Sequence, residues 1–117
     1  MATKRIQNSY YIVSDMGRAC AFYEAVLGLG LKFRDGERWA QYDVNGANFS
    51  LSSIAEAPRR VEGGIVVFEV DDIAAAKAKI VEMGGSVVVE RDMGGHGRTL
   101  AFLDPEKNLV QLFQRAK

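Results

Sequence analysis

Few residues in this chain have side chains able to do chemistry. Gln111 is a single amide within the apolar stretch 109–113, LVQLF, where a polar side chain either faces solvent or lines a cavity. The chain has one histidine, His96, in the glycine-rich loop 93–98. One histidine supplies neither a metal pair nor an acid–base dyad. Its role stays open between a lid over a site and a surface imidazole.

Strand alternation places the other candidates on one open face of a sheet, because every second side chain points the same way. This face mixes aromatic and aliphatic groups with amides and one carboxylate, which is typical of a small-molecule pocket. The alternate residues are nearly all apolar, so we expect them to pack beneath helices. The open-face set comprises Asn8, Tyr10 and Ile12, then Ile65, Val67 and Glu69, and finally Leu109, Gln111 and Phe113.

Four side chains near this face each have two interpretations. Glu69 is the one carboxylate of the set, and acts either as a general base in a metal-free enzyme or as a rim residue at the strand end. Tyr10 either stacks on a planar ligand or belongs to ordinary packing. Trp39 forms a cavity wall or part of a subunit interface. Arg34 meets an anionic ligand group or ends a solvated strand.

The first half of the chain predicts the element order βαβββ. Residues 6–13 are rich in β-branched and aromatic side chains and predict a strand. A helix follows over residues 16–27, with Ser14 or Asp15 as its cap and apolar positions at helical spacing. Turn signals then separate three strands, expected at residues 31–34, 39–44 and 48–52.

The second half repeats this order after a linker at residues 54–63, which contains the Arg59-Arg60 pair. We expect a strand at 64–70 and then a helix capped by Asp71 or Asp72. Three more strands are expected at residues 86–90, 98–104 and 109–114. The turn between the last two, DPEKN at 104–108, predicts a hairpin in which Pro105 presets φ and Asn108 adopts the left-handed conformation.

The two halves superpose at one offset of 57 residues, which aligns Asp15 with Asp72 and Gly28 with Gly85. This correspondence predicts an internal duplication within a single domain covering residues 1–117, with module one at about 5–53 and module two at about 63–115. Each module has one helix to cover one face of its sheet. The other face is solvated, covered by the second module, or hollow.

Composition excludes several classes of protein. The 117 residues include 15 basic and 15 acidic side chains, so no net charge favours nucleic acid or an anionic membrane. No apolar run approaches the length of about 18 residues that a membrane span needs, and the first residues lack the apolar core of a signal peptide. Cys20 has no second cysteine to pair with. We therefore expect a cytoplasmic protein without a nucleic-acid or membrane partner.

A duplicated βαβββ chain with SDMGRACAFYEAVLGLGL after its first strand and FLDPEKNLVQLF near its end resembles the vicinal oxygen chelate superfamily. That superfamily includes glyoxalase I, ring-cleaving dioxygenases, and the fosfomycin and bleomycin resistance proteins. The resemblance implies an α+β fold in which two tandem βαβββ modules form a cupped mixed sheet with the helices outside. It also implies paired subunits, side by side or with exchanged modules, and a pocket inside the cup.

The family's metal ligands come from the first and last strands of each module. The resemblance assigns these four positions to Asn8, Ser50, Ile65 and Gln111. Two amides, a hydroxyl and an aliphatic side chain lack the imidazole, thiolate or carboxylate groups that zinc, nickel, iron and manganese prefer. We therefore expect no metal and no other cofactor, with a divalent metal kept as the alternative.

These observations lead to one hypothesis and one rival. The hypothesis is a metal-independent binding protein, homodimeric and similar to the bleomycin-resistance branch, which holds an apolar or aromatic small molecule in its cup. The rival is a metal-dependent lyase or isomerase of the glyoxalase type, similar to lactoylglutathione lyase. Whether the protein is an enzyme stays open. The expected ligand-binding residues are Asn8, Tyr10, Trp39, Ser50, Val67, Gln111 and Phe113.

Overall fold

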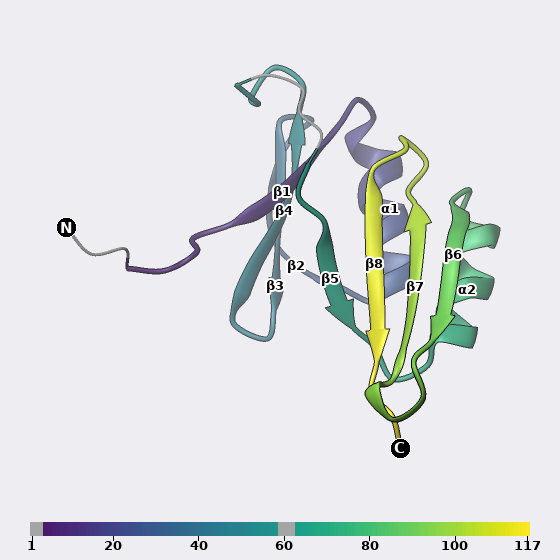
Figure 1. The fold of residues 1–117 in the computed structure, drawn as a ribbon. Helices are drawn as coiled ribbons and strands as arrows, with labels where there is room; N and C mark the ends of the chain where they lie inside the picture. Colours follow the sequence, from purple (N-terminus) through teal and green to yellow (C-terminus); the bar gives the residue numbers. More distant parts are fainter. Residues whose placement is uncertain (1–3, 59–62) are drawn as a thin grey trace.

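The computed structural model describes residues 4–58 and 63–117. Over these residues the chain forms two successive βαβββ units (Figure 1), which confirms the predicted fold class. The Arg59-Arg60 pair of the expected linker lies outside the described residues. The described part of that linker before it, residues 54–58, forms neither helix nor strand. Among the described helices, none is both long and apolar enough to cross a membrane.

The first unit has its strands in the order β1-β4-β3-β2, with β1 parallel to β4 and the other pairs antiparallel. Strand β1 begins at Ser9, later than the predicted start at residue 6, because its pairing with β4 begins with Ser9 opposite Phe49. Just before it, the Gln7 carbonyl accepts from the Asn48 side chain instead of a strand amide. The elements are β1 (Ser9–Val13), α1 (Met16–Leu27), β2 (Gly30–Asp35), β3 (Trp39–Val44) and β4 (Ala47–Ser53).

The second unit repeats this topology in the strand order β5-β8-β7-β6, with β5 parallel to β8. Strand β5 is shorter than the predicted range 64–70, because its ladder with β8 joins only four residue pairs. A short 3-10 turn, Gly94–His96, precedes β7. The other elements are β5 (Val66–Glu69), α2 (Ile73–Glu82), β6 (Ser86–Asp92), β7 (Arg98–Leu103) and β8 (Leu109–Gln114).

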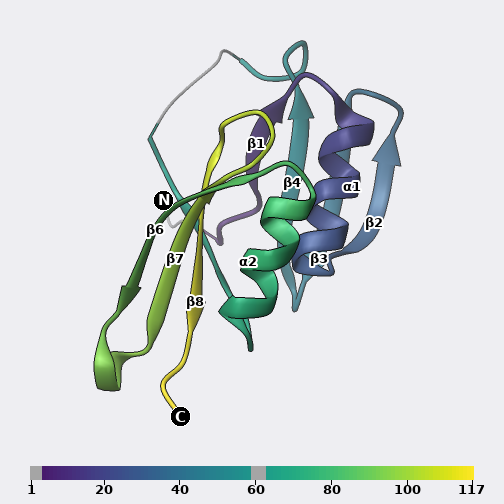
Figure 2. The same ribbon diagram turned by 90° about the vertical axis from the view of Figure 1, so that its right-hand side faces the viewer.

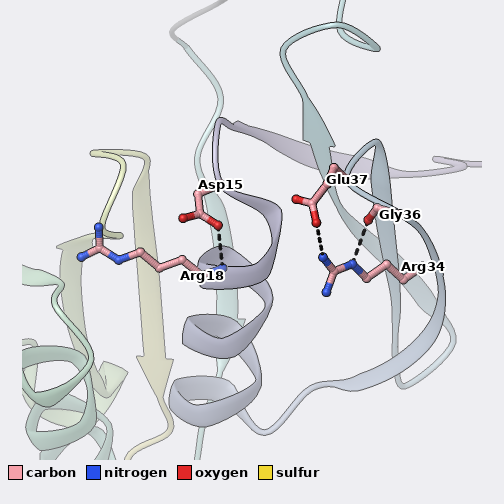
Figure 3. Close-up of polar contacts among 5 residues, drawn as sticks. All are labelled: Asp15, Arg18, Arg34, Gly36 and Glu37. Atoms are coloured by element: carbon pink, nitrogen blue, oxygen red, sulfur yellow. Dashed lines mark hydrogen bonds and ion pairs between the residues drawn. The ribbon is translucent and has the colours of Figure 1, made fainter.

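Both helices begin at aspartates, as expected from the sequence. Asp15 accepts a hydrogen bond from the Arg18 backbone N–H at 3.0 Å (Figure 3), and Asp72 accepts one from Ala75 at 3.1 Å. Such side chains satisfy an N–H that has no partner within the helix. Helices α1 and α2 lie on the same side of the two sheets (Figure 2), so the other face of each sheet is left without a helix.

The hydrophobic core lies beneath the helices and joins both units. Phe22 of α1 contacts Phe102 of β7 with ring centroids 6.1 Å apart, and Phe49 of β4 contacts Phe68 of β5 at 5.0 Å. The hydroxyl of Tyr23 donates to Asp104 across the same boundary at 2.9 Å. Packing between the units therefore determines how the two sheets are placed.

The turn between β7 and β8 corrects one prediction. Lys107, with φ of 67°, adopts the left-handed conformation that we expected at Asn108. The reason is the Asp104 carboxylate, which accepts from the backbone N–H groups of Glu106 and Asn108 and so organises the turn. The Asn108 side chain instead donates to the Ile12 carbonyl at 3.0 Å and so joins the turn to β1.

Candidate functional site

A crevice of about 770 Å³ lies where the two sheets meet. It runs between β1 and β5, which are the edge strands of their sheets. The predicted residues Asn8 and Tyr10 line it, together with Ile65 from the second unit. The other lining residues are Ser9, Tyr11, Ile12, Pro58, Gly63, Gly64, Val66, Lys107, Asn108 and Leu109.

Tyr11 joins the two edge strands at this crevice. Its hydroxyl donates to the Leu109 carbonyl at 2.7 Å and accepts from the Val66 N–H at 2.9 Å. Burial raises the pKa of the Tyr11 hydroxyl, with a further rise from Asp104 and an opposing effect from the Val66 hydrogen bond. The hydroxyl therefore stays protonated near neutral pH and acts as a fixed bridge.

A chain of polar side chains crosses the open face of the first sheet beside the crevice. Gln41 Oε1 accepts from Asn8 Nδ2 at 3.3 Å and from Trp39 Nε1 at 3.1 Å. Ser50 Oγ donates to Asn8 Oδ1 at 2.9 Å. Strand register produces this arrangement, because Ser50 lies opposite Tyr10 of β1 on one side and Gln41 of β3 on the other.

Two aromatic rings meet over the same face. The centroids of Tyr10 and Trp39 lie 5.2 Å apart with an interplanar angle of 59°, although β4 lies between their strands and neighbouring strands are about 4.8 Å apart. The β4 residues opposite them, Ser50 and Ser52, are fully buried. Because serine side chains are small, the two rings can lean together across β4.

The remaining predicted ligand-binding residues lie on the second sheet. Val67 of β5 pairs with Gln111 of β8, and Phe113 follows two residues later on the same face. Val67 is 52% exposed, whereas Gln111 and Phe113 are half-buried. The structure thus gathers Asn8, Tyr10, Trp39 and Ser50 on one sheet, and these three residues on the other.

Three further candidates lie apart from the polar chain. Glu69 forms an ion pair with Arg115 at 2.9 Å and lines a smaller crevice of about 520 Å³ beside the helices. Arg34 is held by Glu37 at 3.0 Å and by the Gly36 carbonyl (Figure 3). His96 is exposed, at the end of the 3-10 turn.

The four positions that the resemblance assigns to metal ligands do not fit a metal. Asn8 Oδ1 already accepts a hydrogen bond from Ser50, and Asn8 Nδ2 donates one to Gln41. Ile65 has no donor atom, and Gln111 is a neutral amide. Within residues 4–58 and 63–117, no cluster of three histidine, cysteine or acidic side chains is placed to hold an ion. This set lacks the charge and basicity that transition metals require.

Gln41 is the central residue that sequence reasoning missed. It is only 8% exposed and accepts two hydrogen bonds in the site. The feature that could have identified Gln41 is the one that identified Gln111, a single amide within a predicted strand. Gln41 also lies two residues after Trp39, and so on the same face of the strand.

Comparison with known proteins agrees with this architecture. The sequence matches the Glyoxalase/Bleomycin resistance protein/Dioxygenase superfamily over residues 5–112. An uncharacterised protein of Mycolicibacterium smegmatis is 30% identical over 104 residues, which are 88% of this chain and 87% of that protein.

Two solved structures illustrate the shared fold. A lactoylglutathione lyase from Agrobacterium tumefaciens has a TM-score of 0.74 and 17% identity, covering 97% of this chain and 95% of its own. A variant of the fosfomycin resistance protein FosX from Listeria monocytogenes, complexed with Mn(II) and 1S,2S-dihydroxypropylphosphonic acid, has a TM-score of 0.78 and 16% identity, covering 98% and 93%. The family match extends over nearly the whole chain, and this protein therefore belongs to the glyoxalase/bleomycin resistance protein/dioxygenase superfamily.

Proposed function

We propose that this protein binds an aromatic or apolar small molecule without a metal, and that the open face beside the crevice holds the ligand. The observation that carries the proposal is the Tyr10–Trp39 ring pair above two buried serines. Aromatic rings of this kind present a large apolar surface with a defined geometry. The amides beneath them are hydrogen-bonded to one another, which suits orientation of a ligand better than coordination of an ion.

The test combines ligand binding with metal analysis. Purified protein is screened by thermal shift against planar aromatic compounds, with and without a chelator. A ligand that binds the native state raises the apparent stability, and we expect this rise to survive chelation. Tyr10→Ala should reduce the rise, whereas Tyr10→Phe, which keeps the ring, should preserve it. If no aromatic compound stabilises the protein, the binding function is wrong.

The second candidate is a metal-dependent lyase of the glyoxalase type, favoured by the fold shared with the Agrobacterium tumefaciens lactoylglutathione lyase. Its test is turnover of the hemithioacetal of methylglyoxal and glutathione after nickel or zinc is added. Stoichiometric metal together with turnover would replace our proposal by this one.

We further propose that the protein acts as a homodimer whose partner covers the open faces. Several apolar side chains of these faces are well exposed, namely Phe33 at 48%, Val67 at 52% and Val89 at 49%. Apolar groups gathered in this way favour association, because burial removes them from water.

The buried free thiol of Cys20 suits the reducing conditions of the cytoplasm, where we expect the protein to act.

A further inference from the structure

The Gln41 carboxamide has a defined orientation, set by Trp39. An indole N–H donates and never accepts, so the Gln41 atom that faces Trp39 Nε1 at 3.1 Å is the oxygen. The same oxygen faces Asn8 Nδ2, and Asn8 Oδ1 consequently faces the hydroxyl of Ser50. The amide nitrogen of Gln41 must therefore point away from this chain of bonds.

That nitrogen has no partner among the hydrogen bonds of residues 4–58 and 63–117. Gln41 is more than nine-tenths buried, yet no buried side-chain nitrogen or oxygen of the described residues lacks a partner. Both facts hold together only if Gln41 Nε2 reaches the surface of the open face. The site thus presents a donor whose rotation is restrained by Trp39 and Asn8.

The surroundings of this donor are apolar and flat. Phe33 of β2 lies directly opposite Gln41. Trp39 lies two residues before Gln41 on β3, and Tyr10, which contacts the Trp39 ring, lies across β4 on β1. Walls of this kind suit a planar molecule, while a single oriented N–H group requires an acceptor atom on that molecule.

The acceptor is expected to be uncharged. The arginines next to these strands are engaged, because Arg34 pairs with Glu37 at 3.0 Å (Figure 3) and Arg38 pairs with Glu56 at 3.6 Å.

Two lysines are near the site, but both are exposed: Lys32 donates to Asn48 Oδ1 at 3.5 Å, and Lys107 lines the crevice. An ion pair between a ligand carboxylate and an exposed ammonium contributes at most about 1 kcal/mol, which does not offset the hydration that the carboxylate would lose beside the rings. A neutral carbonyl oxygen loses much less and accepts equally well from an amide.

We propose that Gln41 determines specificity by donating its amide N–H to the carbonyl oxygen of an uncharged, planar ligand held by Tyr10, Trp39 and Phe33. This inference rests on the proposed binding function and names the ligand class that the site selects. The ligands meeting this description are aromatic ketones, lactones and lactams.

The experiment compares coumarin, a planar lactone, with naphthalene, which has the same two-ring shape without an acceptor, and with 2-naphthoate, which is charged. Dissociation constants are measured by calorimetry, and the Gln41 side-chain amide is followed by NMR. Wild-type protein should bind coumarin about tenfold more tightly than naphthalene, the value of one well-placed hydrogen bond, and 2-naphthoate should bind more weakly than coumarin.

Gln41→Glu keeps an oxygen for Trp39 and Asn8 but replaces the free N–H groups with a second oxygen. This variant should lose the preference for coumarin while still binding naphthalene. The matched control is Gln7→Glu, which makes the same change at an exposed residue and should keep the preference.

The outcomes separate the two proposals. If coumarin and naphthalene bind wild-type protein equally, or if Gln41→Glu keeps the preference, the role of Gln41 is wrong although the binding function stands. If neither compound binds although other aromatic compounds stabilise the protein, the role of Gln41 is wrong. If no aromatic compound stabilises the protein, the proposed function is contradicted as well.

Discussion

Tyr23 illustrates how a single side chain couples stability to pH. Its ring is fully buried, and its hydroxyl donates to the carboxylate of Asp104 at 2.9 Å. Burial raises the pKa of Tyr23 well above its ordinary value of about 10, and the charge of Asp104 adds to the rise. Burial likewise raises the pKa of Tyr42, which donates to Glu24. The native state therefore keeps protons that the unfolded chain releases.

The resulting prediction is a loss of stability in alkali. Below about pH 10 both the native and the unfolded state hold the proton, so each tyrosine makes its full contribution to stability. Above about pH 10 the free energy of unfolding falls by about 1.4 kcal/mol per pH unit for each such tyrosine. Tyr23→Phe should make the pH dependence of the free energy of unfolding less steep by about that amount. Urea denaturation between about pH 9 and pH 11 measures it.

Tyr42→Phe is the companion variant and should reduce the slope by a similar amount, since that hydroxyl also has a raised pKa. Equal slopes in wild-type protein and in both variants would contradict the assignment.

At the scale of elements, the turn at residues 104–108 joins the second unit to the first helix. Glu106 accepts from the N–H and the hydroxyl of Ser14 at 2.6 and 2.7 Å, and from the N–H of Asp15 at 2.9 Å. A carboxylate at this end of α1 also interacts favourably with the helix dipole. The start of α1 thus depends on a residue more than ninety positions away in the chain.

Glu106→Gln tests this contact. A neutral amide cannot accept from three donors with two oxygens as the carboxylate does, so we expect a loss of about 1 to 2 kcal/mol in the free energy of unfolding. Glu82→Gln on α2 removes a charge from an exposed pair with Lys79 and should cost less than about 0.5 kcal/mol. Equal effects of the two substitutions would mean that Glu106 acts only as a surface charge.

For the whole molecule, the placement of both helices on one side leaves two sheet faces open (Figure 2). Phe33 lies on one open face, and Val67 and Val89 lie on the other. A single chain therefore presents the residues of its proposed site on surfaces that a second copy is expected to cover.

Val89→Lys places a charge on the second open face and should weaken dimerisation at least about tenfold, because the charge must lose hydration at the interface. The control is Val81→Lys on helix α2, where the side chain is already 63% exposed, and it should leave the assembly unchanged. Sedimentation of both variants over a range of concentrations measures the effect. A wild-type protein that stays monomeric would refute the dimer.

The element order was predictable because its signals are local. Asp15 and Asp72 cap helices wherever the following residues have helical spacing, and the turn at Pro105 makes a hairpin from neighbouring residues. Alternation along the strand predicted at residues 6–13 likewise placed Asn8 and Tyr10 on one face. The ends of β1 and β5 were less predictable, because a strand ends where its partner stops pairing.

The amino-acid sequence by itself thus determined the duplicated βαβββ order, the helix caps and the side chains available to each face, since these depend on neighbours within a few residues. Only the tertiary structure decided that Tyr10 meets Trp39 above Ser50 and Ser52, and that Trp39 orients Gln41. The Tyr10–Trp39 contact depends on the register between strands far apart in the chain, which is set by packing of the common core. The Trp39–Gln41 bond lies within β3, and tertiary structure joins it to the site through Asn8, 33 residues away in the chain.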